Sequence, residues 1–317
     1  MGNQTNVIDF QLLGFPLGPE LRIFFFLIIL STYILTLTAN IAIIILVRLD
    51  RRLHTPMYLL LSHLSFLEIF YTSTIVPKML ANILQKTRIS LASCLAQIYF
   101  YFSLGSTEFF LLGVMAVDRY IAICNPLRYA AIMNVKVCLQ TTAACWFGAF
   151  LSILFLIILL SKLSFCGPNL INHFFCDISP LLQLSCSDTH MVEIVVFLFA
   201  CNIILSSFLL TIISYVLIVS TILRIPSQKG RQKAFSTCAS HLTVVVILYG
   251  TVIFIYVRPR FAYPMDINKC VGVFNTVVTP LLNPLIYCLR NNEVKLAVKK
   301  QLSRYVMGKI MSPSHIF

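Results

Sequence analysis

The stretch from Ile23 to Val47 reads IFFFLIILSTYILTLTANIAIIILV, which is 25 residues without a charged side chain. Arg22 precedes this stretch and Arg48 follows it. A helix needs about 20 consecutive apolar residues to cross the hydrocarbon core of a bilayer. The sequence therefore predicts a membrane-spanning helix with a charged residue at each end.

Six further apolar segments follow along the chain. Together they predict seven spans, at about residues 23–47, 57–84, 92–124, 137–161, 191–224, 233–257 and 267–289. Residues 291–303 then mix apolar side chains with lysines, which predicts an amphipathic helix on the membrane surface. We expect an all-α membrane protein in which residues 1–317 form a single domain, a seven-transmembrane helix bundle with a short amphipathic C-terminal helix.

The composition disfavours several function classes. Hydrophobic residues make up 59% of the 317 residues and charged residues 11%, whereas roughly 25% of residues are charged in a soluble domain. A chain with so many apolar residues cannot bury them all in the core of a soluble protein, because such a protein needs a polar exterior. A soluble enzyme, a disordered chain and a nucleic-acid-binding protein are therefore not expected, despite the net charge of +13.

The distribution of the basic residues predicts the orientation. If residues 290–317 form a cytoplasmic tail, the inner segments hold 16 of the 24 Lys and Arg residues. Residues 1–22 are then an extracellular tail, as the positive-inside rule requires. The basic inner face predicts attraction to anionic membrane lipid, and docking of a protein partner on the same face is compatible with it.

The outer segments carry sites for covalent modification. Asn3-Gln4-Thr5 matches an N-glycosylation acceptor at Asn3, on the predicted extracellular tail. Four cysteines lie at the predicted outer surface, where disulfides form: Cys94, Cys166, Cys176 and Cys186. Four cysteines allow three pairings, and their spacing alone does not choose between these.

Four motifs at the ends of the spans are informative together. Residues 53–58 read LHTPMY, 115–124 read MAVDRYIAIC, 233–242 read KAFSTCASHL and 280–287 read PLLNPLIY. In this order they closely resemble the vertebrate olfactory receptors, a branch of the rhodopsin-like G-protein-coupled receptors, over essentially the whole chain. The fifth and sixth spans contain no proline, as in that branch. Glu68 departs from the family pattern, which has Asp there, and the subfamily is left open.

The resemblance implies a function and a location. It implies an odorant receptor of the plasma membrane that binds small, volatile, mostly apolar molecules in the outer half of the bundle. It also implies activation of a heterotrimeric G protein with an olfactory Gs-type alpha subunit, which raises cyclic AMP. The disulfide pairs implied are Cys94–Cys176 and Cys166–Cys186. The alternatives are a seven-helix transporter, which would predict internal repeats, and a non-olfactory small-molecule receptor.

The resemblance also implies an activation switch near the predicted inner face. At rest Asp118 pairs with Arg119, which meets the G protein when it is released. Pro284 gives the seventh span a place to bend. A satisfied core histidine is an equal alternative for His241. The switch residues expected are Asp118, Arg119, Tyr120, Tyr215, His241, Asn283, Pro284 and Tyr287.

Two acids lie near the middle of their predicted spans. Glu68 and Glu108 must face the bundle interior, because a charge in the membrane centre costs at least about 2.5 kcal/mol. In the family these positions approach Asn283, where related receptors hold a sodium ion. A sodium or proton site and a protonated, structurally hydrogen-bonded pair both remain open. No other cofactor is expected.

The outer halves of the helices predict a ligand pocket. Positions spaced i, i+3, i+4 and i+7 share one helix face, and here such positions combine aromatic, small and hydroxyl side chains, as small-molecule sites do. Plain helix packing is an equal alternative for each residue. No nucleophile lies beside a base, so no enzymatic activity is expected. The ligand-binding residues expected are Phe102, Gly105, Ser106, Phe109, Phe199, Ile203, Tyr249, Val252, Ile253, Tyr256, Val273 and Thr276.

Overall fold

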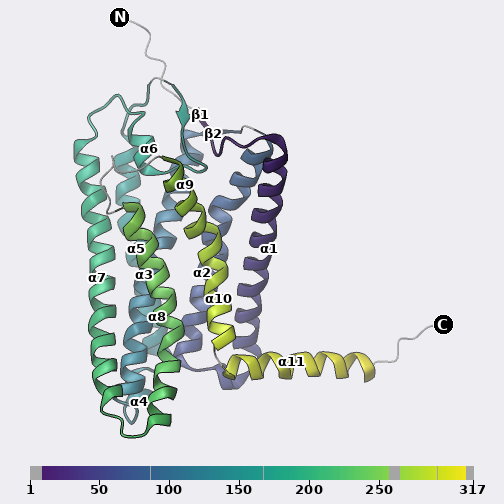
Figure 1. The fold of residues 1–317 in the computed structure, drawn as a ribbon. Helices are drawn as coiled ribbons and strands as arrows, with labels where there is room; N and C mark the ends of the chain where they lie inside the picture. The colour runs from purple at the N-terminus through teal and green to yellow at the C-terminus, as the bar shows by residue number, and fades with distance from the viewer. Residues whose placement is uncertain (1–8, 86, 167, 257–264, 291, 312–317) are drawn as a thin grey trace, which may run out of the picture.

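The structure is a computed structural model, and it describes residues 9–85, 87–166, 168–256, 265–290 and 292–311. Long helices run side by side along one axis and form a bundle (Figure 1). They are α1 (Pro19–Leu49), α2 (Pro56–Leu84), α3 (Leu91–Cys124), α5 (Val135–Ser161), α7 (His190–Leu223) and α8 (Gln228–Tyr256). The last long helical segment of the bundle consists of α9 (Met265–Val273), the π-helical turn η2 (Phe274–Val278) and α10 (Thr279–Arg290).

The fold class expected from the sequence is confirmed. Within the described residues, six helical stretches are long and apolar enough to cross a membrane. The α8 helix is less clear as a span, because its apolar part, Cys238–Ile253, is shorter. The helices begin and end within a few residues of the predicted spans.

Local sequence signals explain where several helices begin. Pro56 occupies the first turn of α2, a position where the missing N–H costs nothing. The Ser90 hydroxyl accepts a hydrogen bond from the Ser93 backbone N–H (3.2 Å), and the Asn134 side chain does the same for Val137 (3.0 Å). These caps fix the first turns of α3 and α5.

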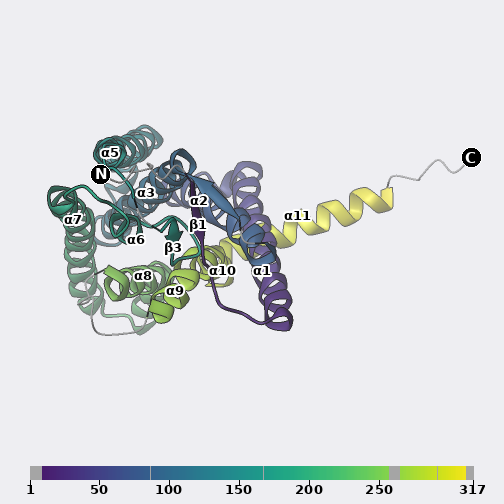
Figure 2. The ribbon, with the colours of Figure 1, turned by 90° about the horizontal axis from the view of Figure 1, so that it is seen from above.

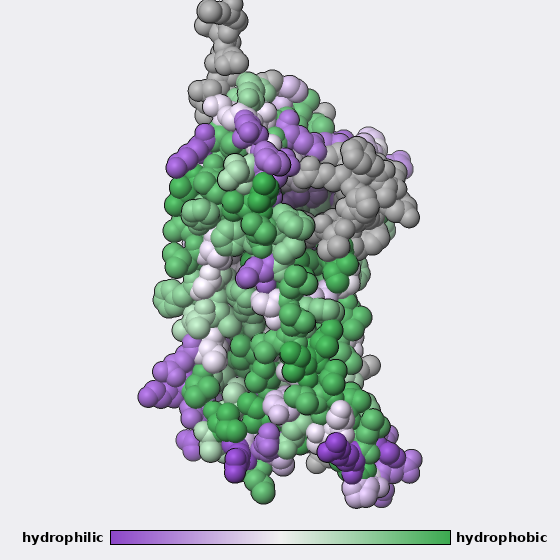
Figure 3. All heavy atoms as spheres, turned by 90° about the vertical axis from the view of Figure 1, so that its left-hand side faces the viewer, coloured by the Kyte–Doolittle hydropathy of each residue, from purple (hydrophilic) through white to green (hydrophobic). Residues whose placement is uncertain are grey.

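Apolar side chains face outward over much of the bundle. Phe147 is 78% exposed, Leu151 71% and Phe197 66%. Figure 3 shows one face of the molecule, with mostly hydrophobic residues along the middle and hydrophilic residues gathered toward the two ends. This distribution is reversed relative to a soluble protein, and it matches a chain surrounded by lipid tails.

A three-stranded sheet closes one end of the bundle. Strand β1 (Asp9–Leu12) pairs antiparallel with β2 (Arg88–Ser90) and parallel with β3 (Leu170–Ile171). The short helix α6 (Ile178–Leu182) lies at the same end (Figure 2). Both disulfides, Cys94–Cys176 and Cys166–Cys186, are also there. We call this the disulfide end, and the opposite end, which carries Arg119, the Arg119 end.

Short elements complete the Arg119 end. These are η1 (Arg51–Leu53), α4 (Tyr129–Ile132) and α11 (Asn292–Met311). The α11 helix projects sideways, across the direction of the bundle helices (Figure 1). It buries Val294 and Ala297 against the core, while Leu296 is 56% exposed and Lys295 faces outward. This arrangement is typical of an amphipathic helix at a membrane surface.

An ionic contact holds α11 near the end of α1. The buried Asp50 accepts hydrogen bonds from the backbone and side chain of Arg52, and Lys300 of α11 lies 3.7 Å away. The hydrogen bonds from Arg52 hold the pKa of the Asp50 carboxyl well below its usual range. The Tyr58 hydroxyl donates to the Glu293 carboxylate at 2.8 Å, which links α11 to α2 as well.

Candidate functional site

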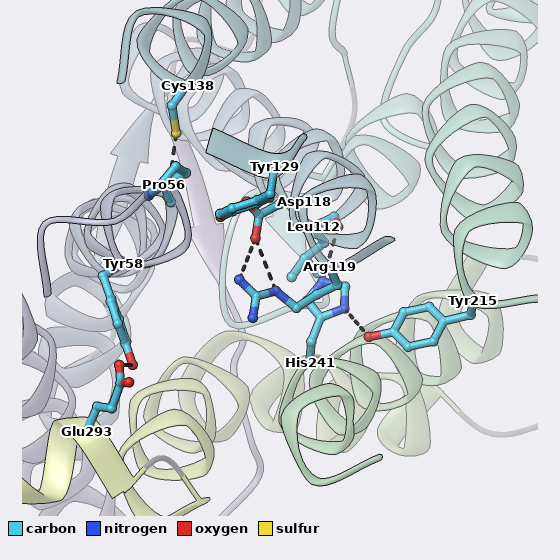
Figure 4. A network of polar contacts seen from close by, with 10 residues as sticks. All are labelled: Pro56, Tyr58, Leu112, Asp118, Arg119, Tyr129, Cys138, Tyr215, His241 and Glu293. Carbon is cyan, nitrogen blue, oxygen red and sulfur yellow. Dashed lines mark hydrogen bonds and ion pairs between the residues drawn. The ribbon is translucent and has the colours of Figure 1, made fainter. Parts of the chain in front are cut away.

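The first polar cluster at the Arg119 end is centred on Asp118. The guanidinium of Arg119 donates to the Asp118 carboxylate, with Nε at 3.1 Å from Oδ2. The Tyr129 hydroxyl of α4 donates to the other carboxylate oxygen at 2.7 Å (Figure 4). Asp118 is 1% exposed and Arg119 8%. The pair is therefore buried, and its two charges must satisfy each other.

His241 joins three helices beside this cluster. Its Nε2 lies 3.1 Å from the backbone carbonyl of Leu112, and its Nδ1 lies 2.8 Å from the Tyr215 hydroxyl (Figure 4). A carbonyl only accepts, so Nε2 carries a proton and donates to Leu112. This imidazole connects α8 to α3 and α7, and both of its nitrogens have a hydrogen-bond partner.

The remaining switch residues lie around these contacts. Tyr287 of α10 is 2% exposed, and its hydroxyl has no hydrogen-bond partner among the described residues. Pro284 lies inside α10, one turn before Tyr287. Tyr120 is partly buried and packs against the small apolar cluster around Tyr215. The structure thus brings the predicted switch residues of α3, α7 and α8 together, and the buried Tyr287 hydroxyl finds no hydrogen-bond partner within the described part of the chain.

Glu68, Glu108 and Asn283 meet in the centre of the bundle. The Asn283 amide donates to the Glu68 carboxylate, and it lies 3.4 Å from the Glu108 carboxylate. Glu68 is 0% exposed and Glu108 3%, and Oε2 of Glu68 has no partner among the described residues. Two buried carboxylates that share one amide donor need a shared proton or a cation between them. This oxygen-rich arrangement fits a sodium ion as well as a proton.

An aromatic cluster lies near the middle of the bundle. Tyr249 of α8 contacts the ring of Phe109 of α3 at a centroid distance of 5.1 Å and that of Phe208 of α7 at 5.2 Å. Its hydroxyl donates to Ser207 at 2.7 Å. Tyr249 is 3% exposed. Three helices therefore converge on one tyrosine, which has an apolar ring and a polar tip.

The other predicted wall residues are buried to different degrees. Ser106, Ile203, Val252 and Thr276 are buried, whereas Phe102, Gly105 and Val273 are partly buried. A side chain at Gly105 would meet the Tyr71 ring at 3.7 Å, which is ordinary contact, so this position has room. The Thr276 hydroxyl is held by the Gly272 carbonyl of its own helix.

Two predicted wall residues lie elsewhere. Phe199 packs against Phe155 of α5, with ring centroids 6.2 Å apart, so it belongs to the outward-facing seam between α5 and α7. Ile253 is 42% exposed, because the turn of α8 directs the neighbouring Val252 inward. The side chain of Tyr256 and the glycosylation acceptor Asn3 lie outside the described residues.

The Cys94–Cys176 disulfide fastens the loop after α5 to α3, over a sequence separation of 82 residues. Gln97 reinforces the attachment: its side-chain oxygen accepts from the Cys176 backbone N–H at 2.9 Å, and its amide donates to the Thr74 carbonyl of α2 at 3.0 Å. The pairing implied by the resemblance is the pairing that the structure has. It fixes the loop at the disulfide end of α3.

Two titratable groups of this loop have shifted pKa values. Burial lowers the pKa of His173 to about 3, with a further contribution from the nearby Lys269 ammonium, so the imidazole is neutral at pH 7. Burial raises the pKa of Asp177 to about 6, although the Ile178 N–H donates to its carboxylate at 2.9 Å. The loop therefore holds a carboxylate whose charge changes in the mildly acidic range.

This shift predicts a pH-dependent stability difference. The folded pKa of Asp177 lies above its unfolded value of about 3.8. Its contribution to the free energy of unfolding is therefore present below pH 4 and is lost as the pH rises through 6. Asp177→Asn keeps an oxygen for Ile178 but does not titrate. We measure the thermal midpoints of the variant and of the unmodified receptor in detergent. The midpoint of the variant is expected to rise steadily relative to that of the unmodified receptor between pH 4 and 6.5. A difference that stays constant with pH would contradict the assignment.

Comparison with known proteins identifies the family. A family model described as "Olfactory receptor" matches residues 29–305. Human olfactory receptor 6F1 is 54% identical over 301 residues, covering 95% of this chain and 98% of its own. The rat protein olfactory receptor 226 is 49% identical, covering 93% and 92%. The chain belongs to the olfactory receptor family. This confirms the resemblance found in its motifs.

Family membership decides the class of function. The olfactory receptor is a multi-pass plasma membrane protein and not an enzyme, and its family implies odorant ligands and coupling to G proteins. Among the described residues, no three His, Cys, Asp or Glu side chains are grouped so as to hold a metal ion. The polar clusters are therefore best understood as parts of a receptor.

Several residues at these sites were missed by the sequence reasoning. Ser207 contacts Tyr249, Asn275 accepts from Thr251 at 3.1 Å, and Tyr129 contacts Asp118. A signal existed for one of them: Ser207, Thr211 and Ser214 follow helical spacing in an otherwise apolar span. Tyr129 could not be found this way, because it reaches Asp118 from the short helix α4, outside the predicted spans.

Proposed function

We propose that the receptor binds a small, volatile, mostly apolar molecule in the half of the bundle nearer the disulfide end and activates a stimulatory, olfactory Gs-type G protein. The observation that carries this proposal is the position of two sites on one helix. Phe109, in the aromatic cluster, and Arg119, in the ion pair, are ten residues apart on α3, which is about 15 Å along a helix. A ligand that shifts α3 affects both.

The chemistry around Tyr249 favours a mostly apolar ligand with one polar group. Phe109, Phe208 and Val252 offer apolar surface, while the Tyr249 and Ser207 hydroxyls offer the polar contact. A ligand of about ten heavy atoms at about 0.5 kcal/mol each binds with about 5 kcal/mol. This corresponds to a dissociation constant on the order of 100 μM.

The mechanism is a population shift between two arrangements of the Arg119 end. The paired Asp118 and Arg119, with Tyr215 bound to His241, form the resting arrangement. An odorant that binds the other arrangement more tightly frees Arg119 for the G protein. Tyr287, whose buried hydroxyl has no hydrogen-bond partner among the residues that the structure describes, then gains one as the α7 and α10 tyrosines rearrange around Arg119.

The orientation proposed is an extracellular N-terminus and a cytoplasmic C-terminus. The excess of basic residues supports a cytoplasmic Arg119 end. The two disulfides support exposure of the opposite end to an oxidising compartment. The odorant then reaches the bundle from outside the cell.

The direct test is a panel of volatile compounds applied to cells that express the receptor, with cyclic AMP as the readout. At least one compound is expected to raise cyclic AMP, and purified receptor should then speed nucleotide exchange on a Gs-type trimer more than on a Gi-type trimer. Exchange on the Gi-type trimer alone would reject the Gs-type partner. A panel without any response in both assays would reject the ligand class.

The position of the ligand site has its own test. Tyr249→Phe removes the hydroxyl that bonds Ser207 and is expected to raise the half-maximal agonist concentration about tenfold, because a lost hydrogen bond costs about 1–1.5 kcal/mol. Thr38→Val is the matched control, since it removes an exposed hydroxyl of α1. Agonist titrations in the cyclic AMP assay measure both. Equal shifts in the two variants would exclude a site at Tyr249.

We further propose that Glu68, Glu108 and Asn283 hold a sodium ion or a proton that favours the resting arrangement. The unpaired Glu68 oxygen and the shared Asn283 amide support this proposal. Replacing sodium by choline is expected to raise basal nucleotide exchange of the purified receptor, and Glu68→Gln and Glu108→Gln are each expected to abolish this response. Glu20→Gln, an exposed acid on α1, is the control. Unchanged sodium and pH dependence in both variants would reject the switch.

A further inference from the structure

A groove opens on the side of the bundle toward the Arg119 end. It has a volume of about 680 Å³ and lies between α1, α2 and α5, with the turn after α1 at its end. Its walls are mostly apolar and include Val47, Leu59, Phe66 and Trp146. The groove is separate from the aromatic cluster and from the Arg119 ion pair, and the proposed function does not use it.

The far wall of the groove is a fixed aromatic surface. The Trp146 ring stacks on Phe150, with centroids 5.7 Å apart, and tilts against Phe66 at 6.0 Å. Phe66 is 46% exposed. The groove therefore presents apolar surface to the membrane, and an acyl chain is the neighbour that the bilayer supplies there.

The end of the groove has the opposite character. Arg48 and His54 line it, and both are exposed. Lys136, next to the lining residue Val135, is also exposed. None of the ion pairs within the described part of the chain uses Arg48 or Lys136. The nearest acid in sequence, Asp50, is buried and already bound to Arg52.

We propose that this groove is a binding site for an anionic glycerophospholipid, with its phosphate-bearing headgroup at Arg48 and His54 and one acyl chain along Phe66 and Trp146. The basic end matches the negative headgroup, and the apolar walls match the chain. A guanidinium at the membrane surface binds phosphate oxygens with more than one N–H donor. The proposal rests on the placement of the chain in a membrane and is independent of the odorant and the G protein.

The site carries its own reporter, because Trp146 is the one tryptophan of the sequence. Bromine atoms on an acyl chain quench tryptophan fluorescence at short range. The purified receptor is reconstituted into phosphatidylcholine vesicles that contain either brominated phosphatidylserine or brominated phosphatidylcholine at the same low mole fraction. We expect the brominated phosphatidylserine to quench Trp146 about fivefold more effectively.

Variants of the headgroup contact give the matched comparison. Arg48→Gln is expected to bring quenching by brominated phosphatidylserine down to the level of brominated phosphatidylcholine, and Arg48→Lys is expected to retain most of it. Arg224→Gln removes the same charge from an exposed residue at the same end of the bundle. Arg224 directly follows α7, which lies across the bundle from α1 (Figure 2). This variant should leave quenching unchanged. Arg48→Lys keeps the positive charge at this position. Retained quenching in this variant would show that the loss in Arg48→Gln comes from the headgroup contact and not from misfolding.

Three results would overturn the proposal. Equal quenching by the two brominated phospholipids would show that the groove does not select a negative headgroup. Equal losses in Arg48→Gln and Arg224→Gln would assign the preference to the charge of the whole face. Stronger quenching by a brominated sterol than by brominated phosphatidylserine would assign the groove to a sterol. None of these measurements depends on activation of the receptor.

Discussion

Asp118→Asn is expected to raise the basal cyclic AMP signal of the receptor about tenfold. The substitution leaves the buried Arg119 without its counter-ion, and a buried pair broken in this way costs about 3–5 kcal/mol. If about 1.4 kcal/mol of this cost falls on the resting arrangement alone, the active population rises about tenfold. The measurement is cyclic AMP without odorant, normalised to receptor at the cell surface.

Two further variants sharpen the result. Tyr129→Phe removes only the second donor to Asp118 and should raise the basal signal by a smaller factor. Arg119→Gln should abolish the response to odorant, because it removes the group proposed to meet the G protein. A basal signal in Asp118→Asn that stays at the level of the unmodified receptor, with normal surface expression, would show that the ion pair does not hold the resting arrangement.

Cys176→Ser is expected to remove most of the receptor from the cell surface. Loss of a native disulfide typically costs 2–5 kcal/mol, a large part of the stability of a folded protein. The cost grows with the enclosed chain: a separation of 82 residues corresponds to about 4.5 kcal/mol, and one of 20 residues, as for Cys166–Cys186, to about 3.3 kcal/mol. Surface labelling of live cells measures the loss.

The second disulfide provides the comparison. Cys166→Ser should leave more receptor at the surface than Cys176→Ser, and its agonist response should be closer to normal. Cys270→Ser, which removes an exposed free cysteine, is the control for the substitution itself. If Cys166→Ser were the more damaging change, the attachment of the loop to α3 would not be its main support.

The spans and the central acids could be predicted from the sequence, because the membrane leaves few alternatives. A long apolar run must form a helix, since no water is present to satisfy its backbone. Glu68 and Glu108 had to face inward, and the structure brings both to Asn283. The physical cost of a charge in lipid predicts these positions without knowledge of the packing.

The rotation of individual helices could not be predicted in the same way. Phe199 and Ile203 are four residues apart, yet Ile203 is buried and Phe199 contacts Phe155 on an outward-facing seam. Both faces of α7 are apolar, so hydrophobicity does not distinguish lipid from protein. The β1 strand was missed because its partners lie about 80 and 160 residues away in the sequence.

The π-helical turn Phe274–Val278 has a geometric consequence for the centre of the receptor. It buries three consecutive residues, Asn275, Thr276 and Val277, and such a turn accommodates one more residue than an α-helical turn. Because each residue of an α-helix adds about 100° of rotation, removing the extra residue would swing everything after it by about that angle. Asn283 would then point away from Glu68 and Glu108. The contacts of Asn283 with Glu68 and Glu108 thus depend on this one π-helical turn, which lies about two helical turns earlier in the chain.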